Sequence, residues 1–110
     1  MTDAPKDFAE KVEAALASEL RTAWDAQLAT EAGRLVIWSI LAKCHLFETT
    51  YTGNALSNFL EGERSIGLRI LADHVMPQGA RFFSDMMIEN ERRMQRIEHA
   101  VRLTKENADD

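Results

Sequence analysis

The sequence predicts an all-α protein, a compact domain of three or four helices with a long, heptad-patterned C-terminal helix. Good helix formers such as Ala, Leu, Glu, Arg and Met dominate it. Its prolines, Pro5 and Pro77, leave a long interval in which nothing interrupts a helix. No segment shows the period-two alternation of a half-buried strand. The 110 residues fit one domain, residues 1–110, with a flexible N-terminus at 1–5 and a frayed acidic tail at 106–110.

The first helix is predicted from Lys6 to Ala29, beginning with the acids Asp7 and Glu10 that favour a helix N-terminus. Its large apolar residues recur every four positions, at Phe8, Val12, Leu16, Leu20, Trp24 and Leu28. On a helix of 3.6 residues per turn this stripe drifts by about 40° per step. We therefore expect the helix to wrap across its neighbours, or its two halves to contact different partners.

The second helix is predicted to begin after Thr30, a suitable N-cap, and to run to about Lys43. It is apolar nearly all round, at Leu35, Val36, Ile37, Trp38, Ile40 and Leu41. Such a helix is buried on several sides, or one side meets a partner. Cys44 is expected to be a small buried side chain, because a lone cysteine forms no intrachain disulfide. A loop is predicted from His45 to Gly53, with Phe47 and Tyr51 covering the core.

The third helix is predicted from about Asn54 to just before Pro77. One face would carry Leu56, Phe59, Leu60, Ile70 and Leu71, together with Glu63, Gly67 and His74. A glycine inside a helix costs about 1 kcal/mol relative to alanine, so Gly62 and Gly67 call for a reason. Close approach of another backbone is the simpler reason, and a functional kink is the alternative. Glu63 needs a partner if it is buried, and Arg34 is a candidate.

The last helix is predicted from about Ala80 to Lys105. Its apolar residues follow the 4-3 spacing of a coiled-coil seam for under three heptads, and Asn90 within the seam could set register or partner number. The seam could pack on the chain's own helices or dock on another subunit. For the second case, the predicted protein-interaction residues are Phe83, Met87, Asn90, Met94 and Ile97, with Arg92, Arg93 and Arg96 around them.

The charge distribution argues against a general nucleic-acid binder. The formal net charge is −5, whereas such binders present a basic face to the phosphates. Residues 64–102 carry seven arginines against five acids, which allows a weakly basic contact surface, although solvated faces with internal ion pairs are the simpler interpretation. We expect nucleic-acid contact to be absent or incidental. The longest apolar run, Leu35 to Leu41, is too short to span a bilayer, so we expect a soluble, unprocessed chain.

The residue pattern contains no recognisable catalytic or metal-binding motif. The histidines at 45, 74 and 99 lack metal-ligand spacing, and the glycines form no phosphate-binding loop. A DNA-reading helix is disfavoured, because acids separate Asn58, Arg64 and Arg69. We therefore expect no catalytic residue, no bound metal and no cofactor, and a protein that acts by contact and not as an enzyme.

Two stretches carry a family resemblance. Gly33-Arg34 opens an apolar helix that ends near Cys44, and Phe59-Leu60-Glu61-Gly62-Glu63-Arg64 is followed by Ile66-Gly67-Leu68. This pattern, covering about a third of the chain, resembles a family of small helical proteins encoded near the portal and head genes of short-tailed bacteriophages similar to a Bordetella podophage. We assign the motif residues to internal packing: Arg34, Glu61, Gly62, Glu63, Arg64 and Gly67.

The resemblance implies a virion component or morphogenesis factor, made in the host cytoplasm and located in the virion. Its partners would be the portal or head–tail connector and copies of itself, or it would be packaged in the head and ejected with the DNA. One alternative is a regulatory module that presents its helix to a host enzyme or an assembly protein. Another is a DNA-packaging or transcription accessory factor that uses the segment from Arg64 to Arg102.

Overall fold

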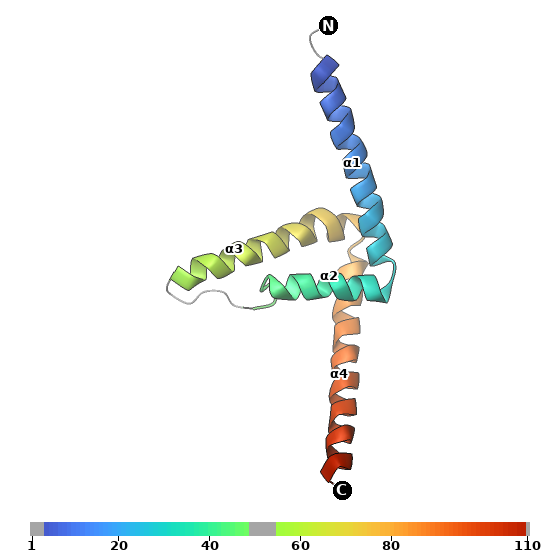
Figure 1. The fold of residues 1–110 in the computed structure, drawn as a ribbon, viewed down its shortest axis with the longest axis vertical. Coiled ribbons are helices and arrows are strands. Elements are labelled where there is room, and N and C mark those ends of the chain that lie inside the picture. Colours follow the sequence, from blue (N-terminus) through green and yellow to red (C-terminus); the bar gives the residue numbers. More distant parts are fainter. Residues whose placement is uncertain (1–3, 49–54, 110) are drawn as a thin grey trace.

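The computed structural model describes residues 4–48 and 55–109, which form four α-helices and no strand (Figure 1). They are α1 (Ala4–Leu28), α2 (Glu31–Lys43), α3 (Ala55–Ile70) and α4 (Arg81–Asp109). A π-helical turn (Leu71–Val75) and a 3₁₀ turn (Met76–Gln78) join α3 to α4. The all-α prediction and its long C-terminal helix are confirmed.

The ends of the chain differ from expectation. Helix α1 begins at Ala4, within the segment expected to be flexible, because Pro5 is compatible with the first turn of a helix. Helix α4 continues through the expected acidic tail to Asp109. Residues 1–3 and 110, and the part of the predicted loop from 49 to 54 that includes Tyr51, lie outside the described residues.

The molecule is extended, not compact. Helices α1 and α4 leave the centre in opposite directions, while α2 and α3 lie to one side (Figure 1). The principal extents are 81 × 39 × 23 Å, and the radius of gyration is 20.1 Å against about 13 Å for a globular chain of this length. Helices of 25 and 29 residues are roughly 38 and 44 Å long, so both run past the small core that their neighbours can build.

The core is small and lies in the middle of the chain. Half-buried Trp24, Trp38, Ile70, Leu71 and Phe83 surround it. On α2 the core face is narrow, since Val36 and Ile40 beside it and Leu35 opposite it are exposed. Helix α2 is thus buried on one side only, and not on several sides as in the first of the two expected arrangements. The buried residues of the core are Leu28, Ile37, Leu41, Leu46, Val75, Phe82 and Met86.

The turn between α1 and α2 depends on Gly33. Thr30 is the N-cap of α2, as predicted, and its side-chain oxygen accepts a hydrogen bond from the Gly33 backbone N–H at 3.0 Å. A Cβ atom at Gly33 would lie only 1.9 Å from the carbonyl oxygen of Gln27. Only glycine lets the first turn of α2 approach the last turn of α1 this closely.

Helix α2 ends in a Schellman motif built on a histidine. His45 has a φ of 60°, its backbone N–H donates to the carbonyl of Ala42, and that of Leu46 donates to the carbonyl of Leu41. The reversal buries Leu46 in the core and places Phe47 on the ring of Trp38, at a centroid distance of 4.4 Å. Phe47 covers the core as expected, although nearly half of its surface stays exposed.

The predicted third helix is interrupted before Pro77. The π-helical turn that follows α3 inserts an extra residue into the helical register, which places Val75 in the core. It also stacks His74 on Trp24 of α1, with ring centroids 4.7 Å apart and an interplanar angle of 2°. The inner face of α3 differs from expectation at its start, where Ser57 is buried and Leu56 and Phe59 are exposed.

Candidate protein-interaction surface

The seam predicted on α4 is not the face on which α4 packs within the chain. The inner face carries Phe82 and Met86, which are buried, followed by Glu89 and Arg93, which reach polar partners on α2. The predicted seam is displaced from this face by one residue, or about 100° around the helix. Met87, Met94 and Ile97 are therefore exposed, Met87 by 51%. Of the two expected arrangements, the structure leaves most of the seam free for a partner.

Two of the eight residues predicted for this surface take part in the chain's own packing. The ring of Phe83 lies 6.3 Å from those of Trp38 and Phe47, in an aromatic cluster beside the core. Arg93 is largely buried and pairs with Glu31 at 3.5 Å. Asn90 is half-buried, whereas Arg92 and Arg96 are exposed with the other seam residues. The prediction is thus corrected for Phe83 and Arg93, which link α4 to α2.

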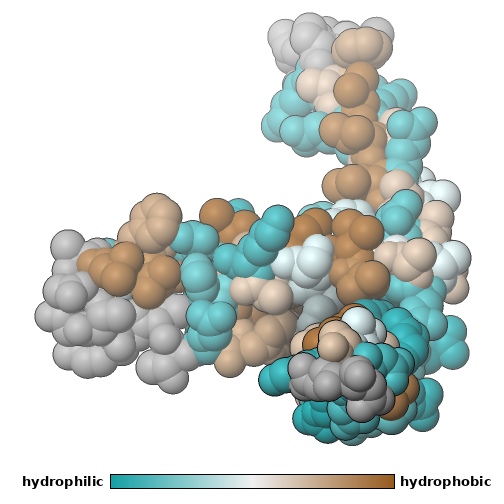
Figure 2. All heavy atoms as spheres, turned by 60° about the horizontal axis from the view of Figure 1, so that its bottom comes forward, coloured by the Kyte–Doolittle hydropathy of each residue, from teal (hydrophilic) through white to brown (hydrophobic). Residues whose placement is uncertain are grey.

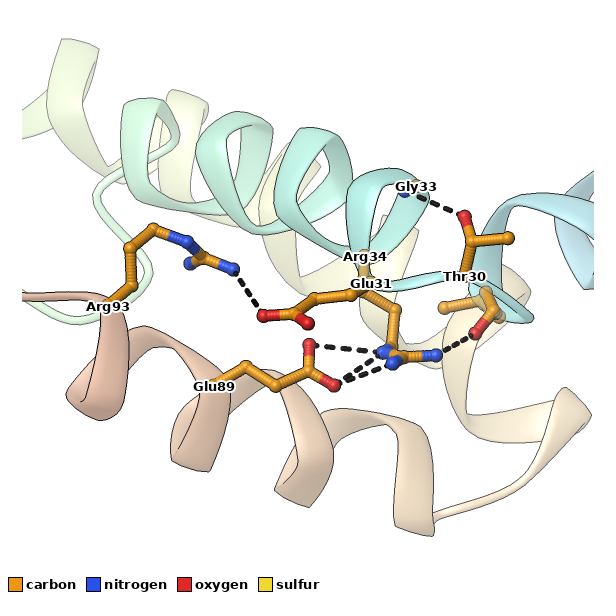
Figure 3. Close-up of polar contacts among 7 residues, drawn as sticks. Thr30, Glu31, Gly33, Arg34, Glu89 and Arg93 are labelled. Carbon is orange, nitrogen blue, oxygen red and sulfur yellow. Dashed lines mark hydrogen bonds and ion pairs between the residues drawn. The ribbon is translucent and has the colours of Figure 1, made fainter. Parts of the chain in front are cut away.

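The strongest polar contact joins α2 to α4 through Arg34 (Figure 3). Its Nε donates to both oxygens of Glu89 at 2.8 and 3.1 Å, and its Nη2 lies 2.7 Å from Oε1. Its Nη1 donates to the carbonyl oxygen of Leu28 at 2.7 Å, satisfying a free acceptor at the C-terminus of α1. The hydrogen bonds to Glu89 raise the pKa of Arg34 above its ordinary value, despite the opposing effect of burial.

This contact corrects the expected pairing of Arg34 with Glu63. The carboxylate of Glu63 instead lies 3.5 Å from Nε2 of His45, whose Nδ1 is 3.0 Å from Glu48. Glu89 was not predicted as a contact residue, because the predicted seam lies one residue away from the face on which α4 packs. The available signal was its position three residues after Met86, on the same helix face.

The other motif residues divide into two groups. Gly67 is buried, and a Cβ atom there would lie 2.7 Å from the Cβ of Cys44, so the close approach expected at this glycine is to a side chain at the end of α2. Arg64 is half-buried. Glu61 and Gly62 are exposed, and nothing lies within 4 Å of a Cβ atom built on Gly62. Their assignment to internal packing was therefore wrong, because they lie on the solvent side of α3.

A second apolar surface runs along the N-terminal part of α1. Its residues were not among the predicted protein-interaction residues. We call residues 4–23 the α1 arm; every described side chain from Lys6 to Ala23 is exposed. The apolar stripe is continuous along the arm (Figure 2). It leads into an apolar hollow between α1 and α2, lined by Leu20, Trp24, Val36 and Ile40 among others. The four-residue repeat was the available signal. Its exposed members are Phe8, Val12, Leu16 and Leu20.

Helix α4 has a comparable projection, residues 94–109, which we call the α4 arm. Each of its side chains from Met94 to Ala108 is exposed. Ile97, Ala100 and Val101 line a shallow, mainly apolar groove along it. The accessible surface of the whole molecule is 8361 Å², roughly 2,000 Å² more than a compact monomer of 12.5 kDa exposes. The exposed arms contribute to this excess, and exposed apolar stripes such as theirs are typical of a surface that binds a partner.

Two other kinds of site are absent from residues 4–48 and 55–109. Nowhere in these ranges do three or more His, Cys, Asp or Glu side chains gather as metal ligands would. In the same ranges, each helix is too short or too polar to cross a membrane.

Comparison with known proteins adds a family. No curated protein and no solved structure matches the chain. Residues 24–93, more than half of the chain, match a family described as Bbp19-like phage proteins. The matched segment contains the whole buried core and the contact between Arg34 and Glu89, and it leaves out both arms. The chain belongs to the family of Bbp19-like phage proteins.

Proposed function

We propose that this phage protein is a non-enzymatic virion component that contacts the portal or the head–tail connector. The observation that carries the proposal is the exposed apolar surface of the two arms, on a chain whose family is a phage family. A protein that keeps its largest apolar stripes outside its own core functions through what covers them. On α4 the contact residues are Met87, Met94 and Ile97, with Arg92 and Arg96 beside them.

Within this proposal the protein either stays in a ring of subunits or is packaged in the head and ejected with the DNA. The small core supports the ejected form, because few buried side chains must separate before the helices thread a narrow channel. The exposed seam of α4 supports the ring form, since it offers each subunit an apolar strip for its neighbour. The copy number distinguishes these forms.

A second candidate is a regulatory module that binds a host enzyme or an assembly protein. The α1 arm supports it, because a free amphipathic helix with apolar residues one turn apart can occupy a hydrophobic groove on a partner. Such a protein would act in the infected cell and be absent from finished particles.

The deciding experiment is quantitative mass spectrometry of purified, DNase-treated particles. Under the virion proposal the protein co-purifies in a fixed copy number, and a number matching the portal ring indicates a portal-bound component. Absence from the particle contradicts the proposal and favours the regulatory module.

A variant pair tests the contact surface. Met94→Asp, like Met87→Asp, should abolish incorporation, because it places a charge on the exposed seam. The control Ile66→Asp places the same charge on an exposed apolar position of α3 and should be incorporated normally. Normal incorporation of both seam variants would rule out the α4 surface.

A further inference from the structure

The two arms of one chain are complementary to each other in length, apolar content and charge, yet they point away from each other. We propose that the partner covering them is a second copy of this chain. In this homodimer the α1 arm of each copy packs antiparallel against the α4 arm of the other. The inference rests on the proposed function only in treating α4 as a contact surface, and it requires no virion.

Both arms expose an apolar face. The α1 arm exposes four large apolar side chains, of which Phe8 is 70% and Leu16 is 63% exposed. On the α4 arm three large apolar side chains share one face, at Met94, Ile97 and Val101, whereas Leu103 is exposed on the opposite face. Beside Ile97 and Val101, the small side chain of Ala100 helps form the groove in which a ridge of larger side chains can pack.

The charges of the arms are opposite where the charged residues are densest. Residues 7–19 of α1 carry four acids and one lysine, a net charge of −3. Residues 94–105 of α4 carry three bases and one acid, a net charge of +2. Two of these α1 segments placed together would repel each other, as would two of these α4 segments. Over the whole arms the net charges are smaller, −1 for residues 4–23 and zero for residues 94–109, because Lys6, Arg21, Glu106 and Asp109 lie outside the two segments. Pairing unlike arms brings opposite charges to the rim of the contact.

The geometry allows both contacts to form at once. The α1 arm is roughly 30 Å long and the α4 arm roughly 24 Å, so each nearly covers the other. In Figure 1 both α1 and α4 run downward from their N-terminal to their C-terminal ends, α1 above the centre and α4 below it. The two arms therefore extend to opposite ends of the 81 Å axis. A two-fold rotation perpendicular to this axis would bring the α4 arm of one copy beside the α1 arm of the other, in the antiparallel direction. The symmetry then forms two identical pairs.

The exposed area is sufficient for this assembly. The surface in excess of that of a compact monomer is roughly 2,000 Å² per chain. A stable interface buries about 800 Å² on each partner. Pairing both arms can therefore bury a standard interface and still leave exposed the hollow at Trp24, Val36 and Ile40 for another partner.

The test begins with the mass of the purified full-length chain, measured by light scattering during size-exclusion chromatography over a wide dilution series. The expected mass is about 25 kDa, twice the 12.5 kDa of one chain. A monomer at every concentration would overturn the proposal and leave the arms to a different protein. A larger assembly would also overturn it, because the two-fold arrangement closes at two copies.

Two arm variants locate the interface. Leu16→Asp and Val101→Asp each place a charge at a position more than 60% exposed in the single chain, and each should convert the dimer to a monomer. Phe59→Asp is the matched control on α3, at 65% exposure, and should remain dimeric. Dimers that persist in both arm variants would refute the proposal.

Mixing the variants distinguishes unlike from like pairing. The Leu16→Asp chain has an intact α4 arm and the Val101→Asp chain an intact α1 arm, so a 1:1 mixture should regain one sound contact and form a heterodimer. If α1 paired with α1 and α4 with α4, every contact in a mixed dimer would contain an aspartate. A mixture that stays monomeric would therefore contradict the pairing of unlike arms.

An aspartate in an apolar stripe could unfold the arm that carries it. A charge-reversal variant therefore tests the pairing of the arms without changing the apolar stripe. The double change Glu13→Lys and Glu19→Lys leaves the apolar stripe intact and should weaken the dimer at least about tenfold at low salt. Glu61→Lys, an exposed glutamate on α3, is its control and should have no effect. An unchanged dissociation constant for the double variant would contradict the charge complementarity. Particle analysis tests the proposed function separately, so either proposal can fail alone.

Discussion

Replacing Arg34 by methionine should destabilise the protein by about 2 kcal/mol. The change keeps an unbranched side chain that reaches the position of Nε, but removes the guanidinium that binds Glu89 through two nitrogens and the carbonyl of Leu28 through the third. Hydrogen bonds to charged groups contribute about 1.5–3 kcal/mol, and the lost partner is left largely desolvated. The two side chains are 16% and 15% exposed, so residual solvent screening keeps the estimate at the lower part of that range. A loss of this size lowers the melting temperature by roughly 10 °C.

The assay is urea unfolding followed by tryptophan fluorescence at fixed protein concentration. Trp24 and Trp38 lie against the core, so their fluorescence reports on the central part of the chain and not on the helicity of the arms. Arg69→Met is the control, because that arginine is exposed on α3 and should change stability by less than about 0.5 kcal/mol. Arg34→Lys should lie between the two, since an ammonium group cannot form the forked contact.

A double-mutant cycle with Glu89→Met tests whether the pair acts as a unit. Each single change strands one partner, whereas the double change to methionine removes both charges. We therefore expect the double variant to be clearly more stable than the sum of the two single losses predicts. Additive losses, or an unchanged midpoint for Arg34→Met, would refute the assignment of this pair as the link between α2 and α4.

Five further substitutions are measured in the same way. Gly33→Ala should cost more than about 2 kcal/mol, because backbone and not a movable side chain occupies the position of its Cβ; a fully stable variant would contradict the tight turn. Gly67→Ala should cost about 1–3 kcal/mol, whereas Gly62→Ala should stabilise by about 0.5–1 kcal/mol, and the reverse order would contradict the packing of α3. Met86→Ala should cost about 2–5 kcal/mol and Met87→Ala less than about 0.5 kcal/mol in the monomer, so equal losses would refute the assigned core face of α4.

Local sequence signals predicted the helices well. Thr30 as a cap, the two prolines and the helix-forming composition act over a few residues, and the structure follows them. The turn at His45 was expected only as a loop, because a histidine in the left-handed conformation is uncommon and its Schellman motif has no glycine to mark it. The π-helical turn was likewise not predicted, since it arises from packing of His74 and Val75 and not from local propensity.

The face that each helix buries was harder to predict. On α4 two apolar stripes lie side by side, one with Phe82 and Met86 and one with Phe83 and Met87. Periodicity alone does not say which stripe faces the core and which faces a partner. The heptad spacing of the second stripe extends further along the helix, and for this reason that stripe was predicted to be the contact surface. The first stripe ends where Glu89 begins the polar contacts to α2, a partnership that no short-range pattern reveals.

Overall shape depends on what the chain does not bury. A compact shape was expected because every apolar stripe was assumed to pack in the core. In α1 only Trp24 and Leu28 do so. Upstream of them the same stripe continues into solvent, at the boundary where the family match begins. The described residues 24–48 and 55–93 thus form a folded unit held by seven buried apolar side chains and the Arg34 pair.

The arms follow a different physical logic. Isolated helices of 16–20 residues are marginally stable in water, because propagation barely repays the cost of nucleation. Along most of each arm the contacts are local, such as the ion pairs Lys11–Asp7 and Arg102–Glu98, and exposed pairs of this kind contribute little. At the base of the α1 arm the side chain of Gln78 also donates to the backbone carbonyl of Arg21. An apolar stripe along such a helix adds stability only when a partner covers the stripe. In the proposed dimer the second copy is therefore part of what makes each arm a helix, and assembly would order the arms and bind them in the same step.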